Sequence, residues 1–190
     1  SGGAKDITMS SDGRIMVVLQ TNVANDLGAI YKSENYGATG SWNETGNGLL
    51  IRSYGKVDIT NDGSITAISN GGRGVLIYKA PQTQLGWNPI DTTPPNGYHW
   101  KDIAISSNGN YMFIVSSTHG DFGAEGNAVV YRSTDQGSTW SAVLTGGRRL
   151  WSVTCSDSGQ NVYVVDTDNS AYHKYSNDYV IIYLGFWGFG

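Results

Sequence analysis

A four-fold repeat constrains the fold of this 190-residue chain more than any other feature of its sequence. Each copy has a run of alternating apolar and polar residues, followed by a polar turn that ends in glycine. The turn glycines are Gly13, Gly63, Gly109 and Gly159, with spacings of 50 (13 to 63), 46 (63 to 109) and 50 (109 to 159) residues. Because Asp-Gly and Asn-Gly pairs favour hairpins, each turn is expected to join two antiparallel strands.

Further apolar runs follow each turn and predict more strands. The second strands are expected at 15–19, 64–68, 111–115 and 161–165, and the third strands at 29–33, 75–79, 128–133 and 171–176. A fourth strand then leads to the next copy. No segment has a sustained helical period, so almost no helix is expected.

This pattern predicts an all-β protein, a β-propeller with four four-stranded antiparallel blades of roughly 45–50 residues each. A single domain is expected over residues 1–190, with blades at approximately 4–55, 56–99, 100–150 and 151–190. Four blades lie at the low end of the range for propellers. A piece of a larger propeller, and closure of the ring through another chain, are therefore open alternatives.

The turn after the third strand carries a polar motif that is complete only in the third copy, Ser-Thr-Asp-Gln-Gly-Ser-Thr-Trp at 133–140. Ser133 and Asp135 can hydrogen-bond nearby backbone amides. Gly137 can take the positive φ that a tight turn requires. Thr139 can bridge back across the turn, and Trp140 offers a large apolar area to neighbouring sheets. The motif therefore predicts a structural turn, with no catalytic role for its aspartate.

This S-x-D-x-G-x-T-W pattern resembles the Asp-box, or BNR repeat, of the sialidase-like β-propeller family. Together, 100–109 and 131–140 are similar to a longer form of the repeat in viral, phage and secreted bacterial proteins. The other copies keep only parts of the box; the first, for example, has Asn35 in place of the aspartate. The resemblance implies a propeller whose ligand site lies on the face opposite to the Asp-box turns.

In a four-stranded meander, the first and third turns lie at one end and the second turn and the link to the next blade lie at the other. The polar and aromatic residues expected at this second end are the candidate ligand-binding residues. They are Asp26, Arg52, Arg73, His99, His119, Asp121, Phe122, Glu125, Arg148, Arg149 and Asp166.

The loop at 117–127 breaks the period of the repeat and is the longest of these loops. Loops longer than a fold requires are frequent sites of function, although an ordinary solvated loop is an equal alternative. His119, Asp121 and Glu125 could together hold a metal ion, but three candidates in one loop are a weak signal. We therefore expect no metal and no cofactor.

Composition excludes several other classes of function. The net charge is −4, and Arg148-Arg149 is too small a basic cluster to follow a nucleic acid backbone. No apolar stretch approaches the roughly 18 residues of a membrane helix, so no membrane span is expected. Cys155 is the single cysteine and is expected to be a small strand residue, not a nucleophile. Trp100 and Trp151 each precede a copy and are expected to pack between adjacent blades.

The C-terminal segment Val180–Gly190 is too apolar for a free tail. It is expected either to form a last strand buried within the domain or to dock on a neighbouring subunit. The second alternative predicts self-association or assembly through this segment.

The preferred hypothesis for function is a non-catalytic binding or assembly module that recognises a glycan or a protein partner opposite to the Asp-box turns. A component of a virion or a surface appendage fits it, with an extracellular or virion-surface location. The alternative is a sialidase-like glycoside hydrolase or a fragment of one. The resemblance implies for such an enzyme an arginine triad, an acid, and a tyrosine activated by a glutamate. Here the early arginine motif of that family is missing, since Arg14-Ile15 is followed by Met16.

Overall fold

The computed structural model describes residues 3–22, 27–50, 55–70, 74–79, 88–89, 99–117, 128–146, 150–166, 171–176 and 181–185. These residues form strands and turns with no helix, which confirms the expected all-β class. Accordingly, this part of the chain has no helix of the length and apolarity needed to cross a membrane.

The strands form four separate sheets, and each sheet is an antiparallel meander of four consecutive strands. Sheet 1 contains β1 (Gly3–Met9), β2 (Met16–Asn22), β3 (Leu27–Ser33) and β4 (Trp42–Leu50). Sheet 2 contains β5 (Lys56–Ile59), β6 (Ile65–Asn70), β7 (Gly74–Lys79) and β8 (Asn88–Pro89). Sheet 3 contains β9 (His99–Ile105), β10 (Met112–Ser117), β11 (Ala128–Ser133) and β12 (Ser141–Gly146). Sheet 4 contains β13 (Leu150–Cys155), β14 (Asn161–Asp166), β15 (Ala171–Ser176) and β16 (Ile181–Gly185).

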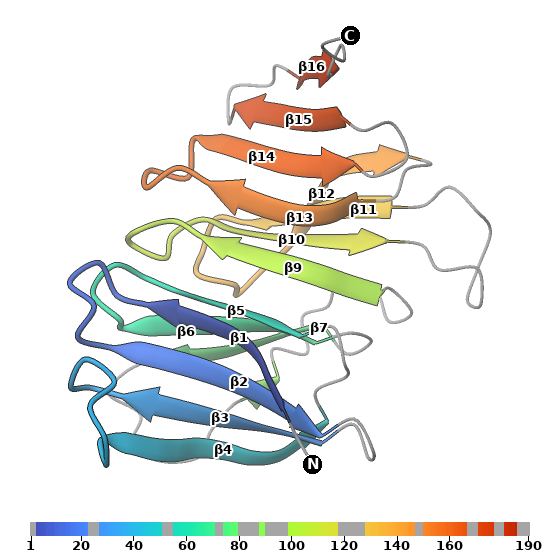
Figure 1. Ribbon diagram of the computed structural model, residues 1–190. Helices are drawn as coiled ribbons and strands as arrows, with labels where there is room; N and C mark the ends of the chain where they lie inside the picture. The colour runs from blue at the N-terminus through green and yellow to red at the C-terminus, as the bar shows by residue number, and fades with distance from the viewer. Residues whose placement is uncertain are drawn as a thin grey trace, which may run out of the picture.

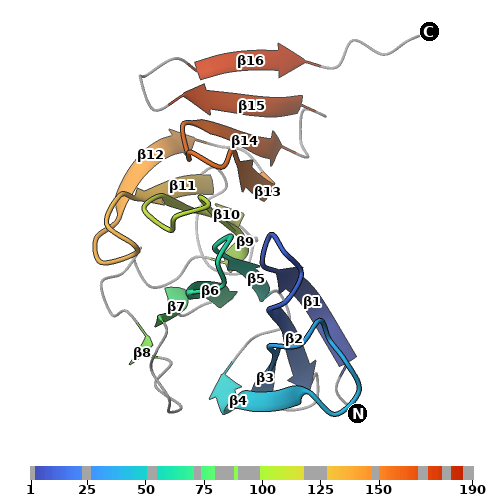
Figure 2. The same cartoon turned by 90° about the vertical axis from the view of Figure 1, so that its left-hand side faces the viewer.

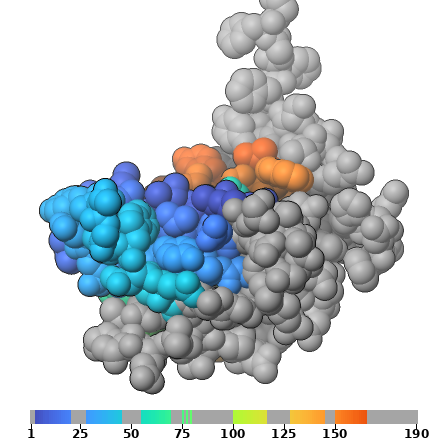
Figure 3. Space-filling model, turned by 60° about the horizontal axis from the view of Figure 1, so that its bottom comes forward, coloured from blue at the N-terminus to red at the C-terminus, as the bar shows by residue number. Residues whose placement is uncertain are grey.

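The four sheets lie in a row in the order of the sequence, with sheet 1 and sheet 4 at its two ends (Figures 1 and 2). The first strands of successive sheets are neighbours, because β1 contacts β5, β5 contacts β9, and β9 contacts β13. The near surface of sheet 1, blue to cyan in Figure 3, faces away from this row. The β1, β5, β9 and β13 strands therefore line the inner side of the arrangement.

Apolar side chains fill the three spaces between successive sheets. Side chains alternate along a strand, so one face of each sheet points to the preceding sheet and the other to the following one. Between sheets 1 and 2, for example, Val17, Leu19 and Ile30 pack against Val57 and Ile68. Full burial of one such side chain stabilises the fold by about 1.5–3 kcal/mol. The row of sheets is therefore held mainly by these three apolar layers.

The first turn of each sheet is hydrogen-bonded to the first turn of the next. Ser11 N–H donates to the Asn61 carbonyl at 2.9 Å, and Asn61 N–H donates to the Ser107 carbonyl at 3.0 Å. Ser107 N–H then donates to the Asp157 carbonyl at 2.9 Å. These residues each lie two positions before their turn glycine, so one bond is repeated across all three junctions.

Aspartates on the first strands add a second link between sheets. In each case, a carboxylate accepts from a backbone N–H of the following sheet. The bonds are Val57 N to Asp6 Oδ2 at 2.8 Å, Ile105 N to Asp58 Oδ2 at 2.7 Å, and Val153 N to Asp102 Oδ2 at 3.0 Å. Because these strands lie side by side without forming one continuous sheet, the carboxylates satisfy backbone donors that no β-ladder reaches.

The turn at 133–140, whose sequence resembles the Asp-box, forms a closed network of hydrogen bonds. Ser133 is buried, and its Oγ accepts from Gly137 N at 2.8 Å and donates to Asp135 Oδ1 at 2.8 Å. Asp135 also accepts from Thr139 N at 2.8 Å and from Thr139 Oγ1 at 2.7 Å. Trp140 Nε1 donates back to the Gly137 carbonyl at 3.1 Å. Gly137 has a φ of 81°, as the turn requires.

The incomplete box of the first sheet keeps much of this geometry. Ser33 Oγ accepts from Gly37 N at 3.1 Å, and Trp42 Nε1 donates to the Gly37 carbonyl at 3.2 Å. Asn35 stands in the aspartate position, and its backbone N–H donates to Ser33 Oγ at 3.2 Å. The serine, glycine and tryptophan are thus sufficient for this turn.

The two tryptophans that precede a repeat have different environments, which corrects the expectation that both pack between sheets. Trp100 is 1% exposed and meets Tyr131 edge to face, with ring centroids 5.8 Å apart. Trp151 is 54% exposed. Trp100 lies nine residues before Gly109, whereas Trp151 lies eight before Gly159. Because a shift by one residue reverses the direction of a strand side chain, Leu150 takes the buried position in sheet 4.

We expect Ser133→Ala to lower the free energy of unfolding by about 1–3 kcal/mol, since it leaves the buried Gly137 N–H without an acceptor. The measurement is urea unfolding of the wild type and the variant. Thr134→Ala, at an exposed position of the same turn, is the matched control. Equal midpoints for the two variants would contradict this role for Ser133.

Stability should also fall as the pH rises through about 6, because burial raises the pKa of Asp58 from 3.8 to about 6. Between these values the folded state holds a proton that the unfolded chain releases, so a higher pH favours unfolding. Two pKa units correspond to about 3 kcal/mol.

Asp58→Asn isolates this effect, since burial also raises the pKa of Asp102. We expect the free energy of unfolding of the wild type to fall more steeply between pH 4 and 7 than that of the variant. Parallel pH profiles in urea unfolding would show that Asp58 titrates normally.

Candidate functional site

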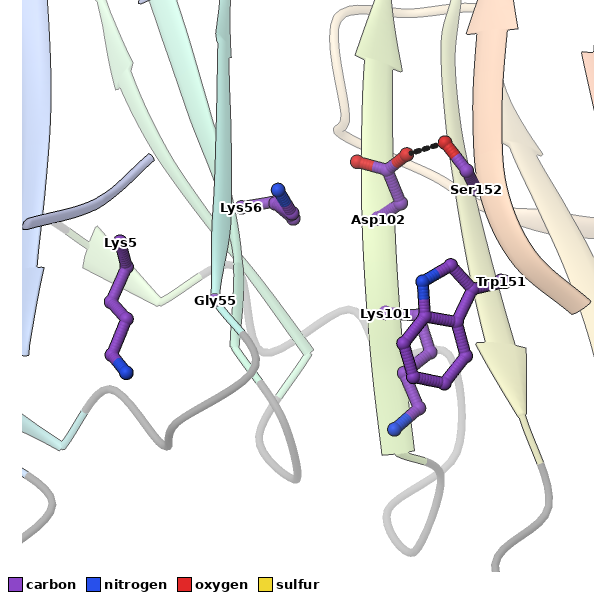
Figure 4. Close-up of a pocket in the computed structure, with 7 residues that line it drawn as sticks. All are labelled: Lys5, Gly55, Lys56, Lys101, Asp102, Trp151 and Ser152. Atoms are coloured by element: carbon purple, nitrogen blue, oxygen red, sulfur yellow. Dashed lines mark hydrogen bonds between the residues drawn. The ribbon is translucent and has the colours of Figure 1, made fainter. Parts of the chain in front are cut away.

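A cavity of about 230 Å³ opens between the first strands of sheets 1 to 4 (Figure 4). Its walls come from the beginnings of β1, β5, β9 and β13. Its lining residues are Lys5, Gly55, Lys56, Lys101, Asp102, Trp151 and Ser152. The first turns and the turn at 133–140 lie at the other end of the sheets, because β1, β5, β9, β13 and β11 each run towards these turns. The cavity therefore lies at the end where the sequence predicts a ligand.

The repeat itself brings these residues together. Lys5, Gly55, Lys101 and Trp151 each lie eight residues before their turn glycine. Lys56, Asp102 and Ser152 each lie seven residues before it. Four copies of one structural position thus meet on the inner side, where they hold lysine, glycine, lysine and tryptophan.

A β-bulge directs three of these side chains into the cavity. The register of β1 against β2 skips Lys5, that of β9 against β10 skips Lys101, and that of β13 against β14 skips Trp151. A bulge leaves its extra residue outside the ladder and changes the direction of its side chain. The lysines and the tryptophan therefore depart from the alternation that would place them between the sheets.

Positive charge dominates the lining. Lys5, Lys56 and Lys101 contribute three ammonium groups, against one carboxylate from Asp102. Lys56 Nζ also lies 3.5 Å from Asp6 Oδ1, which neutralises part of its charge. Burial lowers the pKa of the Lys101 ammonium, since it removes water from around the charge. In a chain with a net charge of −4, this is a local basic site.

Trp151 forms an aromatic wall beside Lys101, whereas Lys5 lies on the opposite side of the cavity (Figure 4). Lys101 Nζ lies 5.0 Å from the centroid of the Trp151 ring, within the range of a cation–π interaction. This contact orients the ring while more than half of its surface remains exposed. The aromatic ring can stack on the apolar ring face of a ligand. The neighbouring ammonium group can bind an anionic substituent of the same ligand.

The carboxyl group of Asp102 already accepts hydrogen bonds from other groups of the protein. Its Oδ1 accepts from Ile103 N at 2.9 Å, and its Oδ2 accepts from Val153 N at 3.0 Å and from Ser152 Oγ at 2.5 Å. A general acid must present a proton to its substrate, but both oxygens here face protein donors. Asp102 is thus suited to joining sheets 3 and 4.

The residues predicted to bind a ligand are only partly within the described structure. His99 begins β9 opposite Ser117, and Asp166 ends β14 opposite Leu150, both at the end where the cavity opens. Asp26, Arg52, Arg73, His119, Asp121, Phe122, Glu125, Arg148 and Arg149 lie outside the described residues. Their part in binding stays a prediction.

Sequence reasoning missed the cavity residues because it searched the loops. The signal was nevertheless present: alignment of the four copies on their turn glycines places Lys5, Lys101 and Trp151 at one position. What such an alignment does not reveal is the bulge, which decides whether this position points between the sheets or into the cavity.

The described structure was also searched for a metal site and for a reactive cysteine. No group of three His, Cys, Asp or Glu side chains there is arranged to hold a metal ion, and His119, Asp121 and Glu125 are outside it. Burial raises the pKa of the Cys155 thiol to about 12, so very little thiolate exists at neutral pH. Cys155 is therefore unsuited to a nucleophilic role.

Comparison with known proteins identifies the fold but no family. No protein-family model and no curated protein matches the sequence. A GH74 enzyme from Niastella koreensis is similar in structure, with a TM-score of 0.68 and 17% identity over 96% of this chain and 30% of that one. An ancestral GH74 enzyme has a TM-score of 0.66 and 15% identity over 97% and 28% of the two chains. TolB from Acinetobacter baumannii has a TM-score of 0.65 and 14% identity over 96% and 43%.

These similarities show a β-propeller-like fold, since the neighbours are β-propeller proteins and the identities are too low to show more. This chain spans less than half the length of each of the three.

The charge of the cavity predicts how Trp151 responds to ionic quenchers. Iodide should quench its fluorescence more strongly than caesium does, because the neighbouring ammonium groups attract anions. Trp151→Phe should remove this component, and Arg14→Gln, at the opposite end of the sheets, should leave it unchanged. Identical iodide and caesium quenching of Trp151 would contradict a basic cavity.

Proposed function

We propose that this chain is a non-catalytic binding module that recognises an acidic glycan in the cavity between its first strands. The observation that carries this proposal is the exposed Trp151 ring in a cavity that Lys5, Lys56 and Lys101 also line. Aromatic rings stack on the apolar faces of sugars, and ammonium groups bind carboxylate or sulfate substituents. Neutral sugars use only the first of these contacts and bind more weakly.

In this proposal each sheet is one propeller blade, and the Asp-box is a structural turn at the opposite end. His119 and Arg148, which lie outside the described residues, stay candidates for further contacts with the ligand. An extracellular or virion-surface location fits, because acidic glycans are abundant on cell surfaces. A protein partner with an acidic segment is the other ligand class considered for this end.

A glycan array with sialylated, uronic-acid-containing, sulfated and neutral glycans tests the proposal, followed by calorimetry on the best ligand. We expect acidic glycans to bind. Trp151→Ala should weaken binding at least tenfold, which corresponds to about 1.4 kcal/mol. Lys101→Met should weaken the binding of acidic glycans more than that of neutral ones.

Arg14→Gln removes the same charge at the opposite end and is the matched control. An array without any acidic ligand, or binding that survives Trp151→Ala, would refute the proposal. Binding of acidic peptides alone would support a protein partner instead.

A glycoside hydrolase, or a fragment of one, is the second candidate. The fold similarity to two GH74 enzymes favours it. Against it, the lining includes one carboxylate, Asp102, whose oxygens both accept protein hydrogen bonds, whereas glycosidases usually need two acidic groups at the bond. Turnover of fluorogenic glycosides, including a sialoside, would establish the enzyme and exclude a purely binding role.

A further inference from the structure

One lysine of the cavity stands where the repeat elsewhere places a residue that joins two sheets. Asp6 and Asp102 lie seven residues before their turn glycines, and each accepts from a backbone N–H of the following sheet. In sheet 4 this position holds Ser152, whose Oγ donates to Asp102. In sheet 2 it holds Lys56, and the joining aspartate, Asp58, lies two residues further along β5.

The displaced link has a cost. Asp58 Oδ2 accepts from Ile105 N at 2.7 Å, and Oδ1 accepts from Ile59 N at 2.9 Å. Burial nevertheless raises the pKa of Asp58 to about 6. A carboxyl group with a raised pKa destabilises the fold at neutral pH. Proteins depart from a locally consistent pattern chiefly at functional sites, so the lysine at position 56 indicates a role beyond the junction.

The ammonium group of Lys56 is accessible from the cavity. Lys56 lies between Lys5 on one side and Lys101 on the other (Figure 4). Its side chain is 44% exposed, and its Nζ lies 3.5 Å from Asp6 Oδ1. This distance is long for a charged hydrogen bond, and ion pairs that are open to water are weak. An anionic group of a ligand can therefore replace Asp6 beside Lys56 at little cost.

The other two lysines of the cavity are less suited to contact the charge of a ligand. Lys101 is buried, and its ammonium group already lies against the Trp151 ring. Burial also lowers the pKa of Lys101. Lys5 lies across the cavity from Trp151, and sheet 2 with Lys56 stands between them (Figure 4). A ligand stacked on Trp151 thus has Lys56 as the nearer accessible charge.

On the basis of the acidic-glycan binding proposed above, we infer that Lys56 is the residue that distinguishes acidic from neutral glycans. The sugar ring stacks on Trp151 of sheet 4, and its carboxylate or sulfate group reaches across to the Lys56 ammonium of sheet 2. Asp6 is a positioning residue, which holds the Lys56 side chain in the cavity until the anionic group of the ligand takes its place.

Calorimetry with matched pairs of glycans tests this inference. The pairs are sialyllactose with lactose, oligogalacturonate with its carboxyl-reduced form, and sulfated with unsulfated lactose. The wild type should prefer the acidic member of at least one pair. Lys56→Met should reduce this preference by about tenfold or more, since a charge-assisted contact is lost. Lys56→Arg, which keeps the charge, should retain most of it.

Lys5→Met is the matched control, because it removes the same charge from the same cavity on the side away from Trp151. It should reduce the preference less than Lys56→Met does. A Lys56→Met variant that keeps the wild-type preference, or loses no more of it than Lys5→Met, would overturn the inference and leave the proposed function standing. A wild type that binds no acidic glycan would overturn both.

Asp6→Asn tests the positioning role. The variant removes the competing charge but keeps an oxygen that can accept from Val57 N. We expect the acidic glycan to bind about two- to fivefold more tightly, the strength of a weak ion pair. A purely structural Asp6 gives no such gain. Unchanged or weaker binding, with the urea midpoint of the wild type retained, would contradict this role of Asp6.

Discussion

The contact between the first strand of one sheet and the first strand of the next is the interaction on which the rest of the structure depends. It combines an apolar layer, a turn-to-turn hydrogen bond and an aspartate that accepts from the following strand. Neighbouring sheets share no β-ladder within the described part of the chain, so these elements help to set their spacing and angle. The cavity exists because this contact brings the beginnings of four strands to one place.

The same contact explains why a structural repeat can carry a site. Side chains that face the neighbouring sheets must be apolar or hydrogen-bonded, so their polarity varies little from copy to copy. The position eight residues before the turn glycine has no partner in the ladder, because it is a bulge in β1, β9 and β13 and lies just before β5. It therefore need not stay apolar or hydrogen-bonded. It holds lysine, glycine, lysine and tryptophan in the four copies, and this variation is what makes the cavity chemically specific.

Much of the architecture was predictable from the sequence, because hydrophobic alternation and Asp-Gly turns act over a few residues. The all-β class, the meanders and the end of the sheets that carries the cavity follow from such local signals. The exposed position of Trp151 does not, since it depends on a bulge in β13 and on a one-residue offset from Trp100. Nor do the links from Asp6, Asp58 and Asp102, whose acceptor role depends on strands about 50 residues away in the sequence.

Amide hydrogen exchange tests most directly whether these junctions hold the molecule together. The account predicts slow exchange at Val57, Ile105 and Val153, whose N–H groups donate to aspartates of the preceding sheet. It also predicts that Asp102→Ala accelerates exchange at Val153 far more than at Val57. Exchange at all three amides as fast as at the exposed Ser138 of the Asp-box turn would contradict it.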